Sequence, residues 1–90
     1  MKIYLGEKGL KQSWQNEFPK TIKCHKCKGN CRIMFVGFED YPADKGNFIC
    51  DLHDNTGAKK GGKFWLHDAC AVAVYLCENC FEPNALINQA

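Results

Sequence analysis

Two Cys-x-x-Cys pairs, CHKC at 24–27 and CENC at 77–80, constrain the fold of this chain more than any other feature. One tight turn can present both sulfur atoms of such a pair to one ion, and two such turns can complete the tetrahedron of thiolates that structural zinc prefers. The chain has only 90 residues, and a domain of this size buries a smaller share of its surface on folding than a larger one does. We therefore predict that Cys24, Cys27, Cys77 and Cys80 hold one zinc ion that stabilises the fold.

The cysteine count and the first residues favour metal ligands over disulfides. The chain has seven cysteines, an odd number, and its start carries Lys2, Lys8 and Lys11 without an apolar run of signal-peptide length. In a reducing compartment, close cysteine pairs are more commonly metal ligands than disulfides. No stretch approaches the roughly 20 apolar residues that span a bilayer. We therefore expect a soluble, cytoplasmic protein that does not associate with membranes.

The hydrophobic pattern predicts a small, mostly β domain, or an α+β domain if a short N-terminal helix forms. Antiparallel strands are expected at about 32–38, 47–52, 63–66 and 70–76. Leu10, Trp14 and Phe18 lie on one stripe of a short helix or arm at 7–18 that Pro19 ends, and this stripe is expected in the core. The predicted organisation is a single domain, 1–90, with an N-terminal arm or helix at 1–19, a metal-bound β core at 20–81 and a C-terminal tail at 82–90.

The two cysteine pairs and the β pattern between them resemble the zinc ribbon, a small β fold in which two Cys-x-x-Cys knuckles on separate hairpins share one zinc. The resemblance implies a structural zinc site in a domain that binds either nucleic acid or protein. In this chain, Lys28 and Phe81 directly follow the second cysteine of each pair, where ribbon knuckles usually have glycine. Four thiolates also hold a single iron in rubredoxin-like proteins, so iron is the alternative metal.

A second set of candidate ligands lies between the outer pairs. Cys50-x-x-His53 and His67-x-x-Cys70 form a mixed set that suits a second zinc ion. In a continuous strand, however, Cys50 shares an apolar face with its alternate neighbours while His53 points to the other side. We therefore expect Cys50 and Cys70 to be core residues and about one zinc per chain, with the second site as the alternative. The pattern assigns no role to Cys31.

The sequence contains no recognisable catalytic arrangement. The dipeptides His53-Asp54 and His67-Asp68 join an imidazole to a carboxylate, but neighbouring side chains usually point apart. The stretch GAKKGGK at 57–63 lacks the GKS or GKT ending of a phosphate-binding loop. We therefore expect a binding module rather than an enzyme, with no small-molecule substrate.

Positive charge is concentrated in the first third of the chain. Residues 1–32 carry eight lysines and arginines against two glutamates, whereas residues 33–90 carry four lysines against eight acids. This basic end suits an acidic protein partner, or nucleic acid with Trp14, Phe18 and Phe35 as stacking surfaces. We expect contacts with an unidentified protein partner and keep nucleic-acid binding as the alternative. In either case the candidate contact residues are Lys20, Lys23, Lys26, Lys28 and Arg32.

Overall fold

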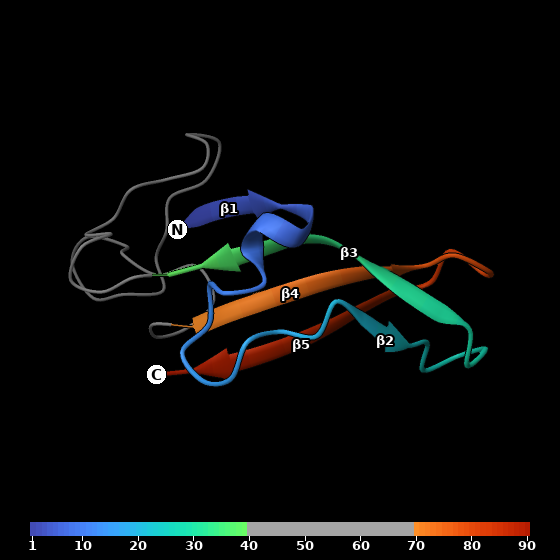
Figure 1. Cartoon of the computed structure of the whole chain (residues 1–90). Helices are drawn as coiled ribbons and strands as arrows, with labels where there is room; N and C mark the ends of the chain where they lie inside the picture. The colour runs from blue at the N-terminus through green and yellow to red at the C-terminus, as the bar shows by residue number, and fades with distance from the viewer. Residues whose placement is uncertain (40–69) are drawn as a thin grey trace, which may run out of the picture.

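The computed structural model describes residues 1–39 and 70–90. Their strands form one antiparallel sheet in the order β1-β3-β4-β5, and β2 also pairs with β3 (Figure 1). The bounds are β1 Lys2–Leu5, β2 Thr21–Lys23, β3 Asn30–Phe38, β4 Cys70–Cys77 and β5 Pro83–Gln89. The predicted mostly β, antiparallel fold is confirmed.

The predicted strands at 32–38 and 70–76 are present as β3 and β4, while those at 47–52 and 63–66 lie outside the described residues. Three strands were not predicted. β1 and β2 have four and three residues, too few for a periodic signal. β5 replaces most of the expected tail at 82–90, because its PNALINQ sequence pairs with β4 despite the low strand propensity of proline and asparagine.

The N-terminal segment forms a single 3-10 turn, η1 at Gly6–Gly9, rather than a helix across 7–18. Of the two alternatives predicted for 7–18, a short helix or an arm, the structure therefore has the arm. Instead of continuing a helical ladder, the chain loops back, and the Phe18 N–H donates to the Leu10 carbonyl oxygen at 2.9 Å. Leu10 and Phe18 are nonetheless buried in the core, as the apolar stripe predicted, and Trp14 packs against them.

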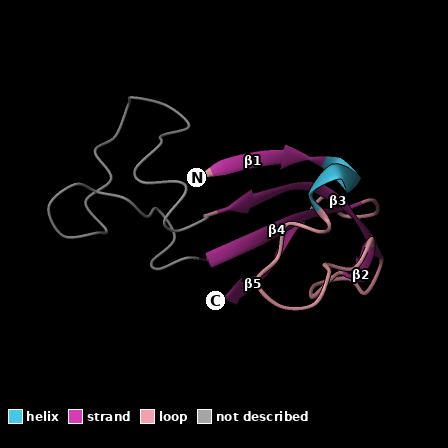
Figure 2. Ribbon diagram, turned by 60° about the vertical axis from the view of Figure 1, so that its left-hand side comes forward, coloured by secondary structure: helices cyan, strands magenta, loops and turns pink. Residues whose placement is uncertain are grey.

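β1 and β2 lie along the same side of β3, and residues 6–20 leave the sheet between them to cover one of its faces. β1 pairs with Phe35–Phe38, and β2 pairs with 30–32. The covering segment reaches β5, where the Trp14 backbone N–H donates to Asn88 Oδ1 at 3.2 Å (Figure 2).

No helix within 1–39 or 70–90 is long and apolar enough to cross a membrane.

The core lies between this segment and the covered face of the sheet. Val36, Ala73 and Tyr75 are fully buried there. The contact is close, since a Cβ added at Gly9 would lie 2.7 Å from the Val36 Cβ. The Tyr75 hydroxyl donates to the Pro19 carbonyl oxygen at 2.6 Å and so holds the end of the covering segment.

Candidate metal centre

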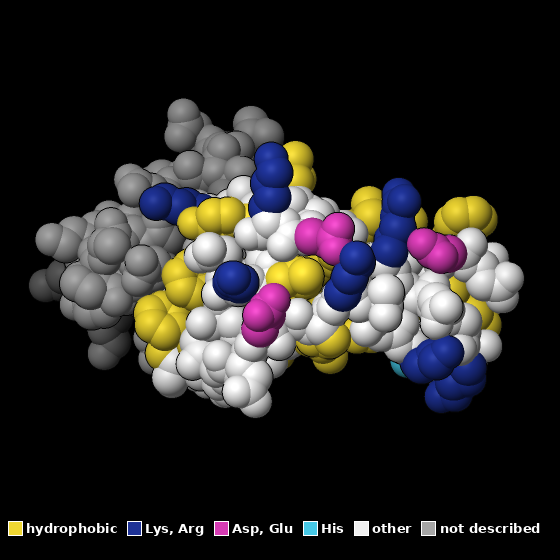
Figure 3. All heavy atoms as spheres, in the orientation of Figure 1, with side chains coloured by type: hydrophobic (Ala, Val, Ile, Leu, Met, Phe, Trp, Pro, Cys, Tyr) yellow, Lys and Arg dark blue, Asp and Glu magenta, His cyan; other side chains and the backbone are white. Residues whose placement is uncertain are grey.

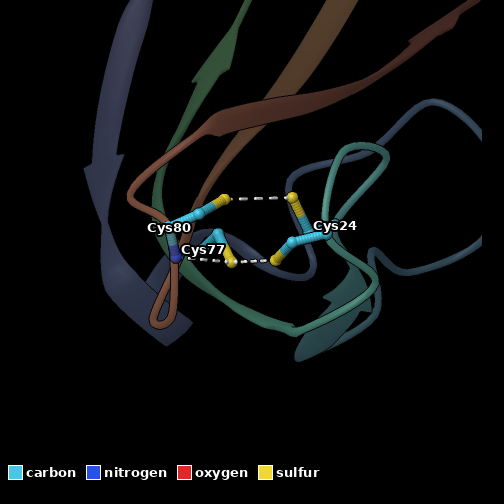
Figure 4. Close-up of side chains that lie close together, drawn as sticks. Cys24, Cys77 and Cys80 are labelled. Atoms are coloured by element: carbon cyan, nitrogen blue, oxygen red, sulfur yellow. Dashed lines mark hydrogen bonds between the residues drawn. The ribbon is translucent and has the colours of Figure 1, made fainter.

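The two cysteine pairs meet at one end of the sheet. Cys24 and Cys27 lie in the turn between β2 and β3, while Cys77 ends β4 and Cys80 lies in the turn to β5. The register of β3 and β4 places Cys31 opposite Cys77, which brings both turns to the same end. The four sulfur atoms all lie within 4.8 Å of one another, and Figure 4 shows those of Cys24, Cys77 and Cys80 directed toward a common centre.

The sulfur spacing fits a tetrahedral metal site. A tetrahedron with metal–sulfur bonds of about 2.3 Å has sulfur atoms about 3.8 Å apart. The Cys24 and Cys80 sulfur atoms are 3.7 Å apart, and those of Cys27 and Cys77 are 3.4 Å apart. The arrangement can therefore hold one metal ion, and the geometry does not distinguish zinc from iron.

Both turns have the same backbone geometry, although neither has glycine after its second cysteine. Lys28 and Phe81 occupy those positions with φ values of 65° and 61°. Their N–H groups donate to the carbonyl oxygens of Cys24 and Cys77, at 3.1 Å in each turn. A left-handed conformation costs a non-glycine residue roughly 1–2 kcal/mol. Each turn therefore adopts its knuckle conformation at a cost in backbone free energy, and the free energy of metal binding would offset that cost.

Backbone N–H groups point at the sulfur atoms in each turn. The N–H groups of Lys26 and Gly29 donate to the Cys24 and Cys27 sulfur atoms at 3.4 and 3.3 Å. In the second turn, those of Asn79 and Cys80 both donate to the Cys77 sulfur atom at 3.4 Å. Because these donors favour the charged form of a thiol, they prepare the site for a cation.

The surroundings shift the pKa values of the ligand thiols in opposite directions. Backbone N–H donation, first from Cys27, lowers the pKa of Cys24 to about 5, and donation from the Cys80 backbone lowers the pKa of Cys77. The Glu82 N–H lowers the pKa of Cys80, but burial and the three neighbouring sulfur atoms outweigh it and raise that pKa to about 12. A divalent cation would displace the remaining protons and neutralise the clustered thiolates.

Asn84, from β5, connects the two turns behind the sulfur atoms. Its side chain is only 8% exposed, and its Oδ1 accepts the His25 N–H at 2.9 Å while lying 2.7 Å from the ring Nδ1 of the same residue. Its Nδ2 donates to the Glu82 carbonyl oxygen at 3.0 Å and to the Cys24 sulfur atom at 3.7 Å. No local pattern in the sequence indicates this residue, because His25, Cys24 and Cys31 become its neighbours only when β3, β4 and β5 pair side by side.

Cys31 is fully buried beside the four-cysteine group without belonging to it. Its sulfur atom accepts a hydrogen bond from Asn84 Nδ2 at 3.4 Å. Burial raises its pKa to about 11, and the charges of Cys77 and Cys24 add to that rise, so Cys31 stays a protonated thiol. No disulfide joins any two of the six cysteines within 1–39 and 70–90.

The alternative inner set is only partly described. Cys50, His53 and His67 lie outside the described residues, so the second zinc site remains a sequence-based alternative. Cys70 begins β4 and is buried on the same side of the strand as Val72 and Val74, as the strand pattern predicted.

The five predicted contact residues, Lys20, Lys23, Lys26, Lys28 and Arg32, lie just before and within β2, in the first cysteine turn and near the start of β3, and all five are exposed. Figure 3 shows lysine and arginine side chains gathered at the end of the molecule that holds the cysteine turns, with others interleaved with acids. Lys20 pairs with Glu7 at 2.8 Å, and Lys26 Nζ lies 3.9 Å from a Glu82 carboxylate oxygen. Two of the five predicted contact residues are thus partly neutralised by acids of this chain.

The aromatic residues near this basic end are engaged in packing. Trp14 stacks on Phe38 with the ring centroids 5.1 Å apart and donates its indole N–H to the Glu39 carbonyl oxygen at 3.1 Å. Phe18 is buried in the core, and Phe35 is half-buried. The expectation that Trp14 and Phe18 offer open surfaces for stacking bases is therefore not met.

No protein-family model, curated protein or solved structure matches this chain. The assignment of a class therefore rests on the fold and the site alone. They define a small antiparallel β domain with a four-cysteine group, built from two knuckle-like turns, that can hold a metal ion.

Proposed function

We propose that Cys24, Cys27, Cys77 and Cys80 bind one structural zinc ion in a zinc-ribbon-like domain that acts as a binding module for a protein partner. The convergence of the four sulfur atoms at tetrahedral spacing carries the proposal. The ion would join the turn before β3 to the turn after β4, two segments separated by about half of the sequence. Small domains commonly gain much of their folding free energy from such a link.

A structural role is favoured over a catalytic one because four thiolates fill the coordination sphere. Catalytic zinc sites keep a position open for water or substrate. Zinc is favoured over iron because closed four-cysteine sites of paired Cys-x-x-Cys turns are typical of structural zinc. The two metals are easily distinguished, since an iron-loaded site would give a visibly coloured protein.

The first test is the metal content of protein purified without added metal, measured by native mass spectrometry. We expect about one zinc ion per chain and no bound ion in a Cys24→Ser, Cys80→Ser variant. Cys31→Ser is the matched control, since it removes a buried thiol beside the site without removing a ligand. Iron in place of zinc, or zinc retained in the double variant, would contradict the proposal.

Protein binding is favoured over nucleic-acid binding by two observations. Glu7 and Glu82 already lie beside Lys20 and Lys26, and Trp14 and Phe18 pack into the core. The discriminating experiment is oligonucleotide binding as a function of salt, because each phosphate contact contributes about 0.7 to 0.9 to the log–log slope. We expect no salt-dependent binding at low ionic strength. Binding that a Lys23, Lys26, Lys28→Gln triple variant weakens, with a flatter slope, would instead establish the nucleic-acid alternative.

A further inference from the structure

The face of the sheet opposite the covering segment presents two continuous apolar rows. Residues directly opposite one another in antiparallel strands point to the same face. The register therefore aligns Ile3, Gly37, Val72 and Ile87 in one row and Leu5, Phe35, Val74 and Ala85 in the next. Contacts at Gly37 confirm this side, because a Cβ added there would meet the Val72 and Ile3 side chains at 3.3 and 3.4 Å, together with the Met1 sulfur atom at 3.3 Å. We call these two rows the open face.

The edges of the open face are accessible to solvent, while Phe35, Val72 and Val74 in its middle are half-buried and Gly37 is buried. Leu5 is 71% exposed and Ile87 63% exposed, at its two edges, and Ile3 is 38% exposed. Single exposed apolar residues are ordinary, but contiguous apolar patches on small proteins commonly mark interaction sites. Neither row contains a charged residue. The opposite face of the same sheet is, by contrast, buried under residues 6–20.

A basic row continues the open face toward the cysteine turns. β2 and β3 pair Thr21 with Arg32 and Lys23 with Asn30. Because Arg32 lies opposite Leu76 and Phe35 opposite Val74 on β4, both cations project from the same side of the sheet as Phe35 and Leu5. Lys23 Nζ donates to Asn30 Oδ1 at 3.1 Å. Arg32 is exposed and forms no salt bridge with any acid among residues 1–39 and 70–90. The surface is thus apolar at one end and basic at the other.

A cavity marks the junction of the two parts. It has a volume of about 590 Å³ and lies where the chain leaves the sheet after β1 and returns at β2, beside Leu5, Ile33, Met34 and Arg32. Met34 pairs with no residue of β1, β2 or β4, since β1 and β2 pair with other parts of β3 and the register with β4 shifts between Ile33 and Phe35. Its side chain is partly exposed. The volume falls within the range of roughly 300–1,000 Å³ that is usual for ligand pockets. Two glutamates line the cavity, and neither pairs with Arg32 among the described residues: Glu7 pairs with Lys20, and Glu78 forms no salt bridge. The Arg32 guanidinium can therefore pair with an incoming carboxylate.

We propose that the open face, with its basic row and this cavity, is the docking surface for an acidic amphipathic segment of the protein partner. Apolar side chains of the segment would cover the two rows and enter the cavity, and a carboxylate would pair with the Arg32 guanidinium. Charge complementarity selects this occupant, since an apolar partner without acids would leave Arg32 buried and unpaired. The inference rests on the proposed role as a protein-binding module and names the surface and partner chemistry of that role.

The test uses the full, metal-loaded chain and a fluorescein-labelled short peptide of alternating leucine and glutamate, followed by fluorescence anisotropy. Matched peptides of leucine with lysine and of serine with glutamate separate the apolar contribution from the charge contribution. We expect Leu5→Asn to weaken binding of the leucine–glutamate peptide by about ten-fold or more, because it removes an exposed apolar side chain that the bound peptide would bury. Arg32→Gln should weaken binding and flatten its salt dependence.

Two control variants are matched in exposure. Phe81 is also 71% exposed but lies in the second cysteine turn, and asparagine tolerates its positive φ, so Phe81→Asn should bind the peptide as the wild type does. Lys11→Gln removes an exposed cation from the covering segment and should likewise have no effect.

The inference is overturned if the leucine–lysine peptide binds equally well, or if Leu5→Asn and Arg32→Gln bind as the wild type does. It is also overturned if no peptide binds, or if sedimentation shows that Leu5 instead mediates pairing of two copies of this chain. Zinc content and amide spectra of the same samples separate this failure from that of the proposed function. A folded chain with one zinc that binds no peptide refutes only the docking surface, whereas a folded chain without zinc refutes the structural site.

Discussion

Replacing Asn84 with alanine tests whether the residue behind the sulfur atoms contributes to metal binding. The substitution removes the acceptor of the His25 N–H at 2.9 Å and the donor to the Glu82 carbonyl oxygen at 3.0 Å. It also removes the donors to the Cys24 and Cys31 sulfur atoms, at 3.7 and 3.4 Å. The first turn would lose its side-chain connection to β5, while all four proposed ligands would remain.

The magnitude follows from these contacts. A net contribution of about 0.5–1.5 kcal/mol for each of the two hydrogen bonds with backbone groups gives a total of roughly 1–3 kcal/mol. At 1.4 kcal/mol per factor of ten, this loss corresponds to an affinity reduced by roughly 5- to 150-fold. Residues that orient metal ligands typically contribute 10- to 100-fold to affinity, which lies within that range. We therefore expect Asn84→Ala to bind zinc about 10- to 100-fold more weakly.

The assay is competitive zinc titration against a chromophoric chelator at neutral pH. Asn79→Ala is the matched control, because the Asn79 side chain also donates to a ligand sulfur atom, that of Cys27 at 3.7 Å, but is exposed. We expect less than about a three-fold change for this variant, since exposed hydrogen bonds contribute little. Equal affinities for Asn84→Ala and the wild type, or equal losses in the two variants, would refute the reasoning.

Three further predictions concern the thiols and the core. Cys31→Ala should retain the metal and lose about 1 kcal/mol of unfolding free energy in urea denaturation, since it truncates a small buried side chain; loss of metal would make Cys31 a ligand. Zinc binding at pH 7 should release at least one proton but fewer than four, because Cys80, with a pKa of about 12, is protonated while Cys24, with a pKa of about 5, is already ionised. Affinity should accordingly fall as the pH falls and protons compete for the thiolates; calorimetry in buffers of different ionisation enthalpy counts the protons, and release of none, or of all four, would contradict the mixed site. Gly9→Ala should destabilise the chain by about 1–3 kcal/mol, because its Cβ would lie 2.7 Å from the Val36 Cβ, and an unchanged urea midpoint would show that the covering segment is not packed so closely.

The sequence predicted those parts of the fold that have a local signal. The apolar runs of β3 and β4 are long enough to identify a strand, and the Cys-x-x-Cys spacing selects residues that the turns then bring together. The stripe of Leu10, Trp14 and Phe18 correctly indicated the core although its helical periodicity was misleading. Burial was therefore easier to predict than the conformation that achieves it.

The parts that escaped prediction depend on contacts between distant segments. β5 is a strand because β4 supplies its hydrogen bonds, and its Asn84 and Asn88 side chains find most of their partners in segments distant in sequence. The left-handed conformations of Lys28 and Phe81 likewise follow from the turns around the cysteines rather than from residue preference. The open face is visible only from the strand register, since its two rows collect residues from four separate strands.

The dependence of the fold on the metal is the most direct test of the central claim. Amide NMR spectra recorded before and after removal of zinc by a chelator, and again after zinc is restored, report on β3, β4 and β5 together. We predict that the dispersed β-sheet resonances collapse without zinc and return with about one equivalent of the ion. A metal-free chain that keeps its dispersed spectrum would contradict the claim that the four cysteines hold the fold through a structural zinc.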